Sequence, residues 1–152
     1  HTEYAALRMP RKNYFFGKFM HGDYPDYIVR LIRKSRCDWP VTIHARPIVN
    51  GRTASIPSRR HDLAIVHLAN ESVEARLAKI NVYSDKELLR RSGQHFSVGK
   101  AFMKCSWRFL RFYLIKGGFR DGKAGFTYAA LNACYKFTTI AKIWERQFLS
   151  EK

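Results

Sequence analysis

The sequence has few of the features that mark a disulfide-rich or zinc-binding domain. It contains three cysteines, Cys37, Cys105 and Cys134, and no C-x-x-C pair. An odd count without paired spacing argues against a disulfide framework or a zinc finger, and it favours a reducing compartment. No two of the six histidines have the H-x-x-x-H spacing that would place metal ligands on one face of a helix.

Complete catalytic motifs are also absent from the sequence. It has no D-x-D motif, no glycine-rich phosphate loop after a strand, and no nucleophile signature around a Ser, Cys or Lys. No apolar run reaches the roughly 18 residues that a membrane-spanning helix needs. From its residues alone the sequence therefore assigns no catalytic residue.

Acidic residues are scarce in the second half of the chain. The net charge is +16, from 28 Lys and Arg against 12 Asp and Glu. Residues 90–152 carry +10 of this excess, and no acidic residue lies between Glu87 and Asp121. Such a balance calls for a polyanionic partner: nucleic acid, an anionic membrane face or a phosphate-rich substrate. At 46% hydrophobic the chain can bury a core, so a disordered basic tail is excluded.

The pattern of the residues predicts an α+β chain, with short strands first and three helices after. We expect strands at 27–33, 41–44 and 52–56, and a buried strand at 63–68, while Pro10 interrupts the first apolar stretch. Ser72 is a candidate N-cap for a helix that ends by Gly93. A second helix is expected over 97–116 and a third from 122–125 to about 149.

The second helix carries the clearest pattern. Its basic residues fall within an arc of about 80°, and apolar and aromatic residues fill most of the remaining circumference. A basic stripe beside an aromatic face is typical of a helix lying in a membrane interface. A core helix with a solvated basic edge, or phosphate contacts to nucleic acid, would give a similar pattern. The predicted membrane-binding residues are Lys100, Lys104, Trp107, Arg108, Arg111 and Phe112.

Five residues in the first half are candidates for a ligand site. Asp26 and Arg30, which follow Tyr24, lie at the start of a predicted strand. Arginine is suited to bind a phosphate or a carboxylate, but Asp26 and Arg30 could equally form a structural ion pair. His44 and His67 each end a strand, so each could be a substrate donor or an acid-base group, and His44 a metal ligand. A lone histidine is, however, more often structural.

Four segments, in order, resemble a known family. They are residues 24–34, 42–56, 63–87 and 109–145, with the stretches K-I-N-V-Y-S, G-F-R-D-G-K-A-G-F and K-I-W-E among them. Together they resemble the C-terminal half of family 2 glycosyltransferases, in particular membrane-associated bacterial enzymes that build lipopolysaccharide core and related surface glycans.

The resemblance implies a GT-A fold and an inverting transfer from a nucleotide-sugar donor to a glycan or lipid-linked acceptor. A divalent metal, Mg or Mn, held by a D-x-D motif normally steadies the diphosphate, and a carboxylate acts as general base. Both motifs precede the region that this chain resembles. We therefore expect a missing N-terminal catalytic half, no metal site supported within this chain, and no transfer by the chain alone.

The resemblance also suggests a role for each part of the chain. Residues 1–70 would be the acceptor side, 71–93 a connecting helix, and 94–152 a membrane-docking tail. The candidates Tyr24, Asp26 and Arg30 match the segment after the base. His44 matches a histidine that could reach the donor diphosphate or metal, although Ala45 replaces the acidic neighbour. The resemblance implies a peripheral location on the cytoplasmic face of the inner membrane. The alternatives to a glycosyltransferase function are a nucleic-acid-binding module and a non-catalytic structural subunit.

Overall fold

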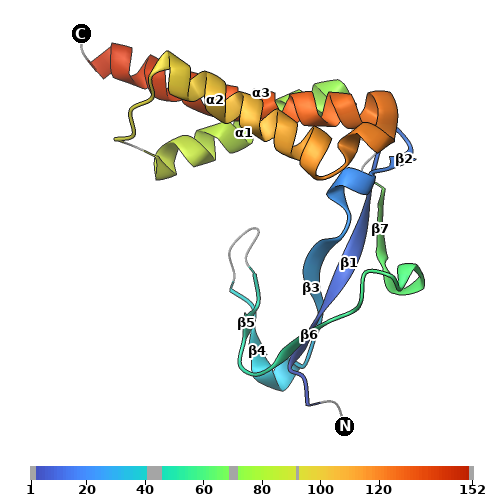
Figure 1. Cartoon of the computed structure of the whole chain (residues 1–152). Coiled ribbons are helices and arrows are strands. Elements are labelled where there is room, and N and C mark those ends of the chain that lie inside the picture. Colours follow the sequence, from blue (N-terminus) through green and yellow to red (C-terminus); the bar gives the residue numbers. More distant parts are fainter. Residues whose placement is uncertain (1–2, 41–45, 69–71, 92, 151–152) are drawn as a thin grey trace. The chain divides into compact units, whose positions relative to one another are not determined.

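The computed structural model describes residues 3–40, 46–68, 72–91 and 93–150. The predicted α+β class is confirmed, with short strands followed by three helices (Figure 1). The chain divides into two compact units. The sheet unit comprises His1–Tyr14 and Asp23–Leu68, and the helical unit comprises Phe15–Gly22 and Ala69–Lys152. The predicted roles of residues 1–70, 71–93 and 94–152 stay predictions.

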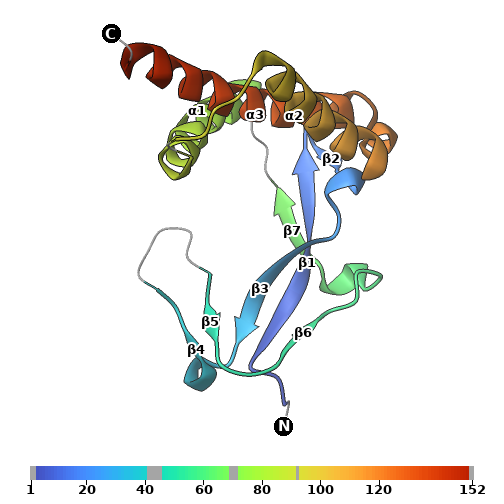
Figure 2. The same ribbon diagram turned by 60° about the vertical axis from the view of Figure 1, so that its left-hand side comes forward.

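Strand β1 (Ala6–Phe15) is the centre of the sheet unit. It pairs antiparallel with β3 (Asp26–Ile32) and parallel with β6 (Thr53–Ser55) and β7 (Ile65–Leu68), as can be followed in Figure 2. Two further short strands, β4 (Cys37–Asp38) and β5 (Ile48–Val49), form an antiparallel pair. Single turns of 3-10 helix follow β3 at Lys34–Arg36 and precede β7 at His61–Leu63.

The expectation that Pro10 interrupts the first apolar stretch is wrong. β1 runs through Pro10, which lies opposite Tyr27 in β3. On the other edge of β1, β6 pairs with residues 6–8 and β7 with residues 11–14. Pro10 therefore falls between two parallel partners, where its missing N–H costs no ladder hydrogen bond on that edge.

The expected buried strand at 63–68 forms as β7, but it is not buried. Val66 is 55% exposed and Leu68 is 66% exposed. β7 pairs with β1 through its backbone, and no described element of the sheet unit packs over these two side chains. The β-branched run therefore predicted the strand correctly and its environment wrongly, because apolar composition does not say what covers a strand.

The helical unit contains α1 (Val73–Arg90), α2 (Val98–Leu110) and α3 (Gly122–Ser150). Ser72 and Ser97 cap the first two helices, and each side-chain oxygen accepts a hydrogen bond from the backbone N–H three residues on. α1 ends at Arg90, before Gly93. The second helix reaches its predicted length, but Arg111–Ile115 is a π-helix, η4, rather than α-helix.

Aromatic and aliphatic side chains from all three helices fill the core of this unit. Phe112 and Phe15 both pack against the ring of Tyr128, with centroid distances of 4.8 Å and 5.5 Å. Met20 and Ile140 are completely buried. The segment Phe15–Gly22 thus belongs to the core of the helical unit, although it precedes most of the sheet unit in sequence.

Backbone packs closely on backbone where the stretch G-F-R-D-G-K-A-G-F folds. A Cβ on Gly125 would lie 1.9 Å from the carbonyl oxygen of Gly118, so no side chain fits there. Asp121 ends the 3-10 turn Gly118–Asp121, directly before α3, and is 2% exposed. Its carboxylate accepts hydrogen bonds from the backbone N–H groups of His21 and Gly22, at 3.0 and 3.1 Å, and faces Nδ1 of His21 at 2.7 Å. This stretch therefore has a structural role inside the helical unit: it packs closely on itself and binds the backbone of His21 and Gly22.

Candidate functional site

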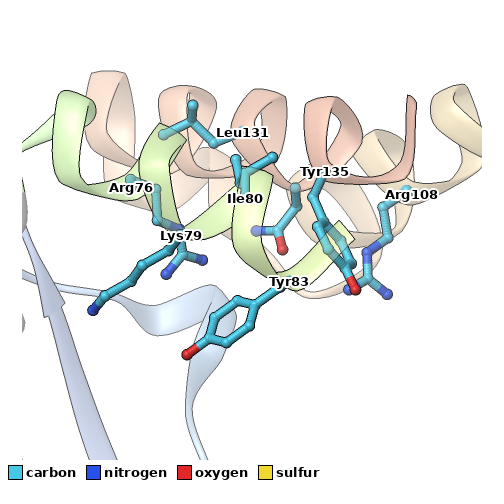
Figure 3. A pocket seen from close by; sticks show the side chains of 8 residues that line it. Arg76, Lys79, Ile80, Tyr83, Arg108, Leu131 and Tyr135 are labelled. Atoms are coloured by element: carbon cyan, nitrogen blue, oxygen red, sulfur yellow. The ribbon is translucent and has the colours of Figure 1, made fainter. Parts of the chain in front are cut away.

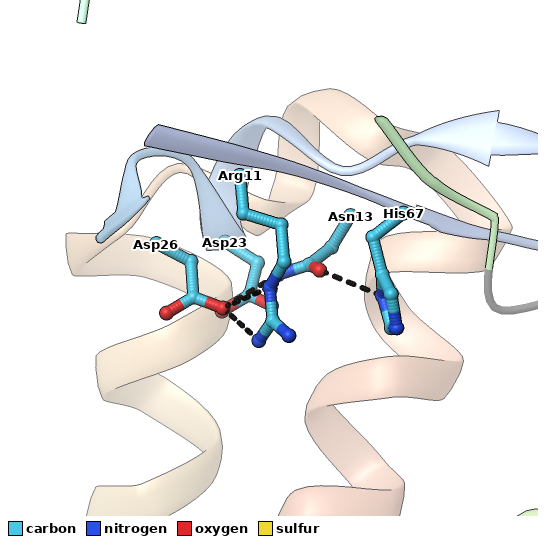
Figure 4. A network of polar contacts seen from close by, with 5 residues as sticks. All are labelled: Arg11, Asn13, Asp23, Asp26 and His67. Carbon is cyan, nitrogen blue, oxygen red and sulfur yellow. Dashed lines mark hydrogen bonds and ion pairs between the residues drawn. The ribbon is translucent and has the colours of Figure 1, made fainter. Parts of the chain in front are cut away.

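A polar network on one face of the sheet unit brings together two of the predicted site residues (Figure 4). Strand register explains it. Arg11 lies directly opposite Asp26 in β3, and Asn13 lies directly opposite His67 in β7. Arg11 and Asn13 are two residues apart on β1, so their side chains emerge on the same face. The register thus gathers residues from three strands around Asn13.

Asn13 joins the two halves of the network. Its side-chain amide nitrogen donates to the carboxylates of Asp23 at 2.8 Å and Asp26 at 3.0 Å. Arg11 forms an ion pair with Asp26, and its Nε donates to the same carboxylate at 2.9 Å. Asn13 is 8% exposed, so a polar side chain at this depth has the partners it requires.

The same geometry fixes the tautomer of His67. Its Nδ1 lies 3.1 Å from Oδ1 of Asn13, and that oxygen can only accept a hydrogen bond. Nδ1 of the neutral ring therefore carries the hydrogen, and Nε2 keeps its lone pair. Since His67 is exposed, Nε2 can accept a hydrogen bond from a ligand hydroxyl.

Tyr24 lies near the two carboxylates in sequence but has other partners. Its hydroxyl donates to the carbonyl oxygen of Ser58, and its ring stacks on His61 with a centroid distance of 5.2 Å. Burial, and to a lesser extent Tyr27, raise the pKa of this hydroxyl above its usual value. The phenol therefore stays protonated and remains a donor at neutral pH.

Arg30 occupies a β-bulge. Leu7 pairs with Leu31 and Arg8 pairs with Val29, which leaves Arg30 as the extra residue in β3. A bulge turns a side chain away from the regular alternation of the strand, and Arg30 is exposed. The alternative expectation of an Asp26–Arg30 ion pair does not hold, because the ion pair of Asp26 is formed with Arg11.

The described residues do not make a metal centre. No three His, Cys, Asp or Glu side chains lie together as ligands in the part of the chain that the structure describes. The guanidinium of Arg11 already pairs with the Asp26 carboxylate, which offsets part of the negative charge that a divalent cation would need there. His44, the predicted metal or diphosphate ligand, lies outside the described residues.

The predicted membrane-binding residues lie on α2 and η4, and all but one of them are exposed. Lys100, Lys104, Arg108 and Arg111 are all exposed, and Trp107 is 58% exposed. Phe112 is 7% exposed and packs in the core of the helical unit, so its side chain cannot contact lipid in this fold.

The wide aromatic face of the second helix separates into two faces in the structure. Ala101, Phe109 and Phe112 turn towards the core, with Phe109 stacked on Tyr113 at 5.3 Å. A second apolar row has the spacing i, i+4, i+7, occupies an arc of about 60° beside the basic residues, and is exposed. Its members are Met103, Trp107 and Leu110.

Two basic residues of α2 also act on a lysine of α3. Burial, and the positive charges of Arg91, Lys104 and Arg108, lower the pKa of Lys136 below its usual value. The positive potential is therefore concentrated on this side of the helical unit. No helix in the described part of the chain has the length and apolar content needed to cross a bilayer.

A known protein is similar to nearly the whole chain. It is LpsC of Rhizobium meliloti (strain 1021), a lipopolysaccharide core biosynthesis glycosyltransferase, and it is 27% identical over 159 residues. This similarity suggests a glycosyltransferase-related chain. The alignment covers 99% of this chain and 56% of LpsC, so the chain spans little more than half the length of that relative. No family model matches the chain. No solved structure matches it either.

Proposed function

We propose that this chain is the acceptor-side and membrane-docking part of an inverting family 2 glycosyltransferase with a GT-A-like fold. It would act on a nucleotide-sugar donor and a glycan or lipid-linked acceptor at a membrane surface. The observation that carries the chemistry is the similarity to the glycosyltransferase LpsC along nearly the whole chain. The implied location is peripheral, on the cytoplasmic face of the inner membrane.

The polar network of the sheet unit is the proposed acceptor site. Nε2 of His67 would accept a hydrogen bond from a sugar hydroxyl, while Asn13 holds the ring in position. Asp23 and Asp26 add carboxylate oxygens on the same face, and exposed Arg30 adds a cation for a charged acceptor. These groups bind and orient; the general base and the donor diphosphate site would be supplied by residues outside this chain.

The exposed face of α2 is the proposed docking surface. Met103, Trp107 and Leu110 would enter the boundary between headgroups and acyl chains, and the adjacent lysines and arginines would contact anionic headgroups. An interfacial helix needs these two faces side by side. Each basic residue near an anionic surface contributes about 1 kcal/mol, so the four of them would add about 4 kcal/mol to the contribution of the apolar row.

Sugar transfer tests the proposed activity. We expect the isolated chain to transfer no sugar and the product of the full native reading frame to transfer it, with radiolabelled nucleotide sugars and truncated lipopolysaccharide as probes. In the longer protein, Asp26→Asn should raise the acceptor KM about tenfold. Asp38→Asn, at an exposed position in β4, is the matched control. Transfer by the isolated chain, or an unchanged KM in Asp26→Asn, would contradict the proposal.

Vesicle co-sedimentation tests the docking surface. The variant with Lys100, Lys104, Arg108 and Arg111 changed to Ser should lose binding to phosphatidylglycerol-containing vesicles, and wild-type binding should fall as salt is raised. Unchanged binding would refute these four basic residues as the docking element.

A nucleic-acid-binding module is the second candidate function, favoured by the net charge of +16. It predicts tight binding to DNA or RNA with a steep salt dependence and no preference for vesicles. A chain that neither transfers sugar in its full-length form nor binds vesicles or nucleic acid would be a non-catalytic structural subunit.

A further inference from the structure

Two pockets of the helical unit differ in how far their polar side chains are already engaged. The first lies between α1, α2 and α3, and its lining includes Arg76, Lys79 and Tyr83 (Figure 3). The guanidinium of Arg76 lies over the ring of Tyr128 at 5.0 Å, and Lys79 and Tyr83 also have interaction partners. These polar side chains of the first pocket therefore already have partners.

The second pocket, which we call the terminal pocket, lies where the end of α1, the connection to α2 and the last turns of α3 meet. Its volume is about 430 Å³, within the range of roughly 300–1,000 Å³ that small-molecule sites occupy. The described lining residues are Leu88, Arg91, Gly93, His95, Ile143, Arg146, Gln147 and Ser150.

Hydrogen bonds fix the connection that forms one wall of the terminal pocket. The indole N–H of Trp144 donates to the carbonyl oxygen of Phe96 at 2.7 Å, and the side-chain amide of Gln147 donates to the carbonyl oxygen of Gln94 at 3.1 Å. From the end of α1, Arg91 donates to the side-chain oxygen of Gln94, also at 3.1 Å. The fold itself therefore holds this wall in place, which lowers the cost of ordering it around a ligand.

The amide of Gln147 also determines which nitrogen of His95 can donate. Because Nε2 of Gln147 donates to the carbonyl oxygen of Gln94, the hydrogen-bond network identifies this atom as the amide nitrogen. The same nitrogen lies 3.0 Å from Nδ1 of His95, and an amide nitrogen can only donate. Nδ1 is therefore the acceptor, and the neutral ring carries its hydrogen on Nε2. Since His95 is exposed, this N–H can donate to a ligand.

The positive charge of the terminal pocket comes from Arg146. The other arginine of the lining, Arg91, forms an ion pair with Glu87 at 2.5 Å, and this hydrogen bond lowers the pKa of the Glu87 carboxyl. The pair therefore adds no net charge at pH 7. Arg146 is exposed, and no Asp or Glu is among the lining residues that the structure describes. A single guanidinium suits a ligand with one negatively charged oxygen group.

Apolar side chains complete the lining. Ile143 of α3 is 4% exposed, and Leu88 of α1 is partly buried, so two helices supply apolar surface. The methylene stems of arginines add to such a surface while their charged ends stay in water. Apolar walls, one cation and one N–H donor together suit a ligand that is itself amphipathic.

We propose that the terminal pocket binds an amphipathic monoanion, an acyl chain that carries one negatively charged oxygen group. Arg146 would pair with the charged group, and Nε2–H of His95 would donate to one of its oxygens. Leu88 and Ile143 would contact the chain. The source of the ligand is either a free fatty acid, with a carboxylate, or an anionic phospholipid, with a phosphodiester. The site goes beyond the proposed glycosyltransferase function, because it requires neither sugar transfer nor the exposed face of α2.

The test uses the whole chain and ligands that stay monomeric, so that no membrane surface is present. Isothermal titration with octanoate tests the carboxylate, and octanol is the uncharged control of the same chain length. Dihexanoyl phosphatidylglycerol below its critical micelle concentration tests the phosphodiester, with dihexanoyl phosphatidylcholine, which has no net charge, as its control. Preferential binding of octanoate assigns a fatty acid, and preferential binding of phosphatidylglycerol assigns a phospholipid. Amide chemical shifts of Gly93, His95 and Gln147 should change on binding.

Three variants test the proposed contacts, after circular dichroism has established that each is folded. Arg146→Gln removes the charge, and His95→Phe removes the N–H donor while keeping an aromatic ring. Arg120→Gln, at an exposed arginine of the same unit outside the pocket, is the matched control. We expect Arg146→Gln to weaken binding of the anionic ligand at least about tenfold and His95→Phe to weaken it by a smaller factor, while Arg120→Gln leaves it unchanged.

Three results would overturn the proposal. They are equal binding of each anionic ligand and its uncharged control, equal loss in Arg146→Gln and Arg120→Gln, and a wild-type chain that binds neither anionic ligand. The variant with the four basic residues of α2 changed to Ser should still bind the monomeric ligand. Loss of binding in that variant alone would assign the ligand to α2 and remove the terminal pocket as its site.

Discussion

The sheet unit and the helical unit are stabilised in different ways. The helical unit buries large side chains, including Phe15, Met20, Phe112 and Ile140. The buried positions described in the sheet unit are small or polar: Ala5, Ala6, Pro10 and Asn13. Apolar burial therefore dominates the stability of the helices. The sheet depends more on its strand ladders and on the network around Asn13, whose hydrogen bonds each contribute about 1 kcal/mol.

The two units also expose apolar residues in different patterns. The exposed residues Leu31, Ile48, Val66 and Leu68 of the sheet unit are spread over three different strands. In the helical unit Met103, Trp107 and Leu110 form one row at helical spacing, beside four basic residues. An apolar row with a charged border is typical of an interaction surface, whereas scattered exposed residues are ordinary.

The largest effect on stability should come from adding a side-chain carbon at Gly125, where the backbone packs very closely in the helical unit. In Gly125→Ala the new Cβ would lie 1.9 Å from the Gly118 carbonyl oxygen, so the backbone must move. We expect a loss of at least about 3 kcal/mol in the free energy of unfolding. Chemical denaturation followed by the helical circular dichroism signal measures it.

Gly99→Ala is the matched control for that substitution. Gly99 is in α2, and nothing lies within 4 Å of its added Cβ. Alanine should stabilise the helix by up to about 1 kcal/mol. Equal destabilisation by the two substitutions would mean that close packing at Gly125 does not hold this unit together.

Removal of the buried carboxylate of Asp121 should lower the free energy of unfolding slightly less. Asp121→Ala leaves two backbone N–H groups, of His21 and Gly22, without their acceptor. We expect a loss of about 2–4 kcal/mol, with hydrogen exchange of these two amides accelerated. If their exchange stays as slow as in the wild type, the carboxylate is not their acceptor in solution.

The corresponding change in the sheet unit is Asn13→Ala. It removes the group that joins His67 to the two carboxylates, and we expect a loss of about 1–3 kcal/mol. A double-mutant cycle with His67→Ala should give a coupling energy above about 0.5 kcal/mol. Additive effects would show that the network does not stabilise the sheet.

The smallest effect is the pH dependence of one ion pair on the helical unit. The hydrogen bond from Arg91 lowers the pKa of Glu87 below its ordinary value of 4.5. The folded state therefore binds this proton less readily, so the stabilisation is full above pH 4.5 and is lost as the pH falls through the lowered pKa. Glu87→Gln should cost less than about 1 kcal/mol at pH 7 and nothing at pH 2. A constant difference between pH 7 and pH 2 would contradict the ion pair.

Much of the helical unit could be predicted from local signals. Ser72 as a cap, and the expected ranges 97–116 and 122–125 to about 149, placed the three helices within a few residues. The π-helix at Arg111–Ile115 could not be predicted, because it depends on how Phe112 packs in the core. For the same reason the aromatic face of the second helix could not be divided into a core side and an exposed side.

The candidate site could be predicted only in part. Asp26 and His67 stood out as polar residues at the ends of strands, but Arg11 and Asn13 did not, because their roles follow from strand register. Register joins residues far apart in sequence, and one sequence carries little information on it. The alternating R-K-N stretch before Tyr14 is the only local sign that Arg11 and Asn13 share a face.

The most direct test of membrane docking is the quenching of Trp107 fluorescence by brominated lipids in anionic vesicles. Trp107 is the exposed tryptophan of α2, so its ring should lie at the acyl boundary when the chain is bound. We predict strong quenching in the wild type and loss of this quenching in Trp107→Phe. Trp107→Phe should still bind the vesicles through Lys100, Lys104, Arg108 and Arg111. Vesicle binding with equal quenching in the wild type and Trp107→Phe would contradict docking through α2.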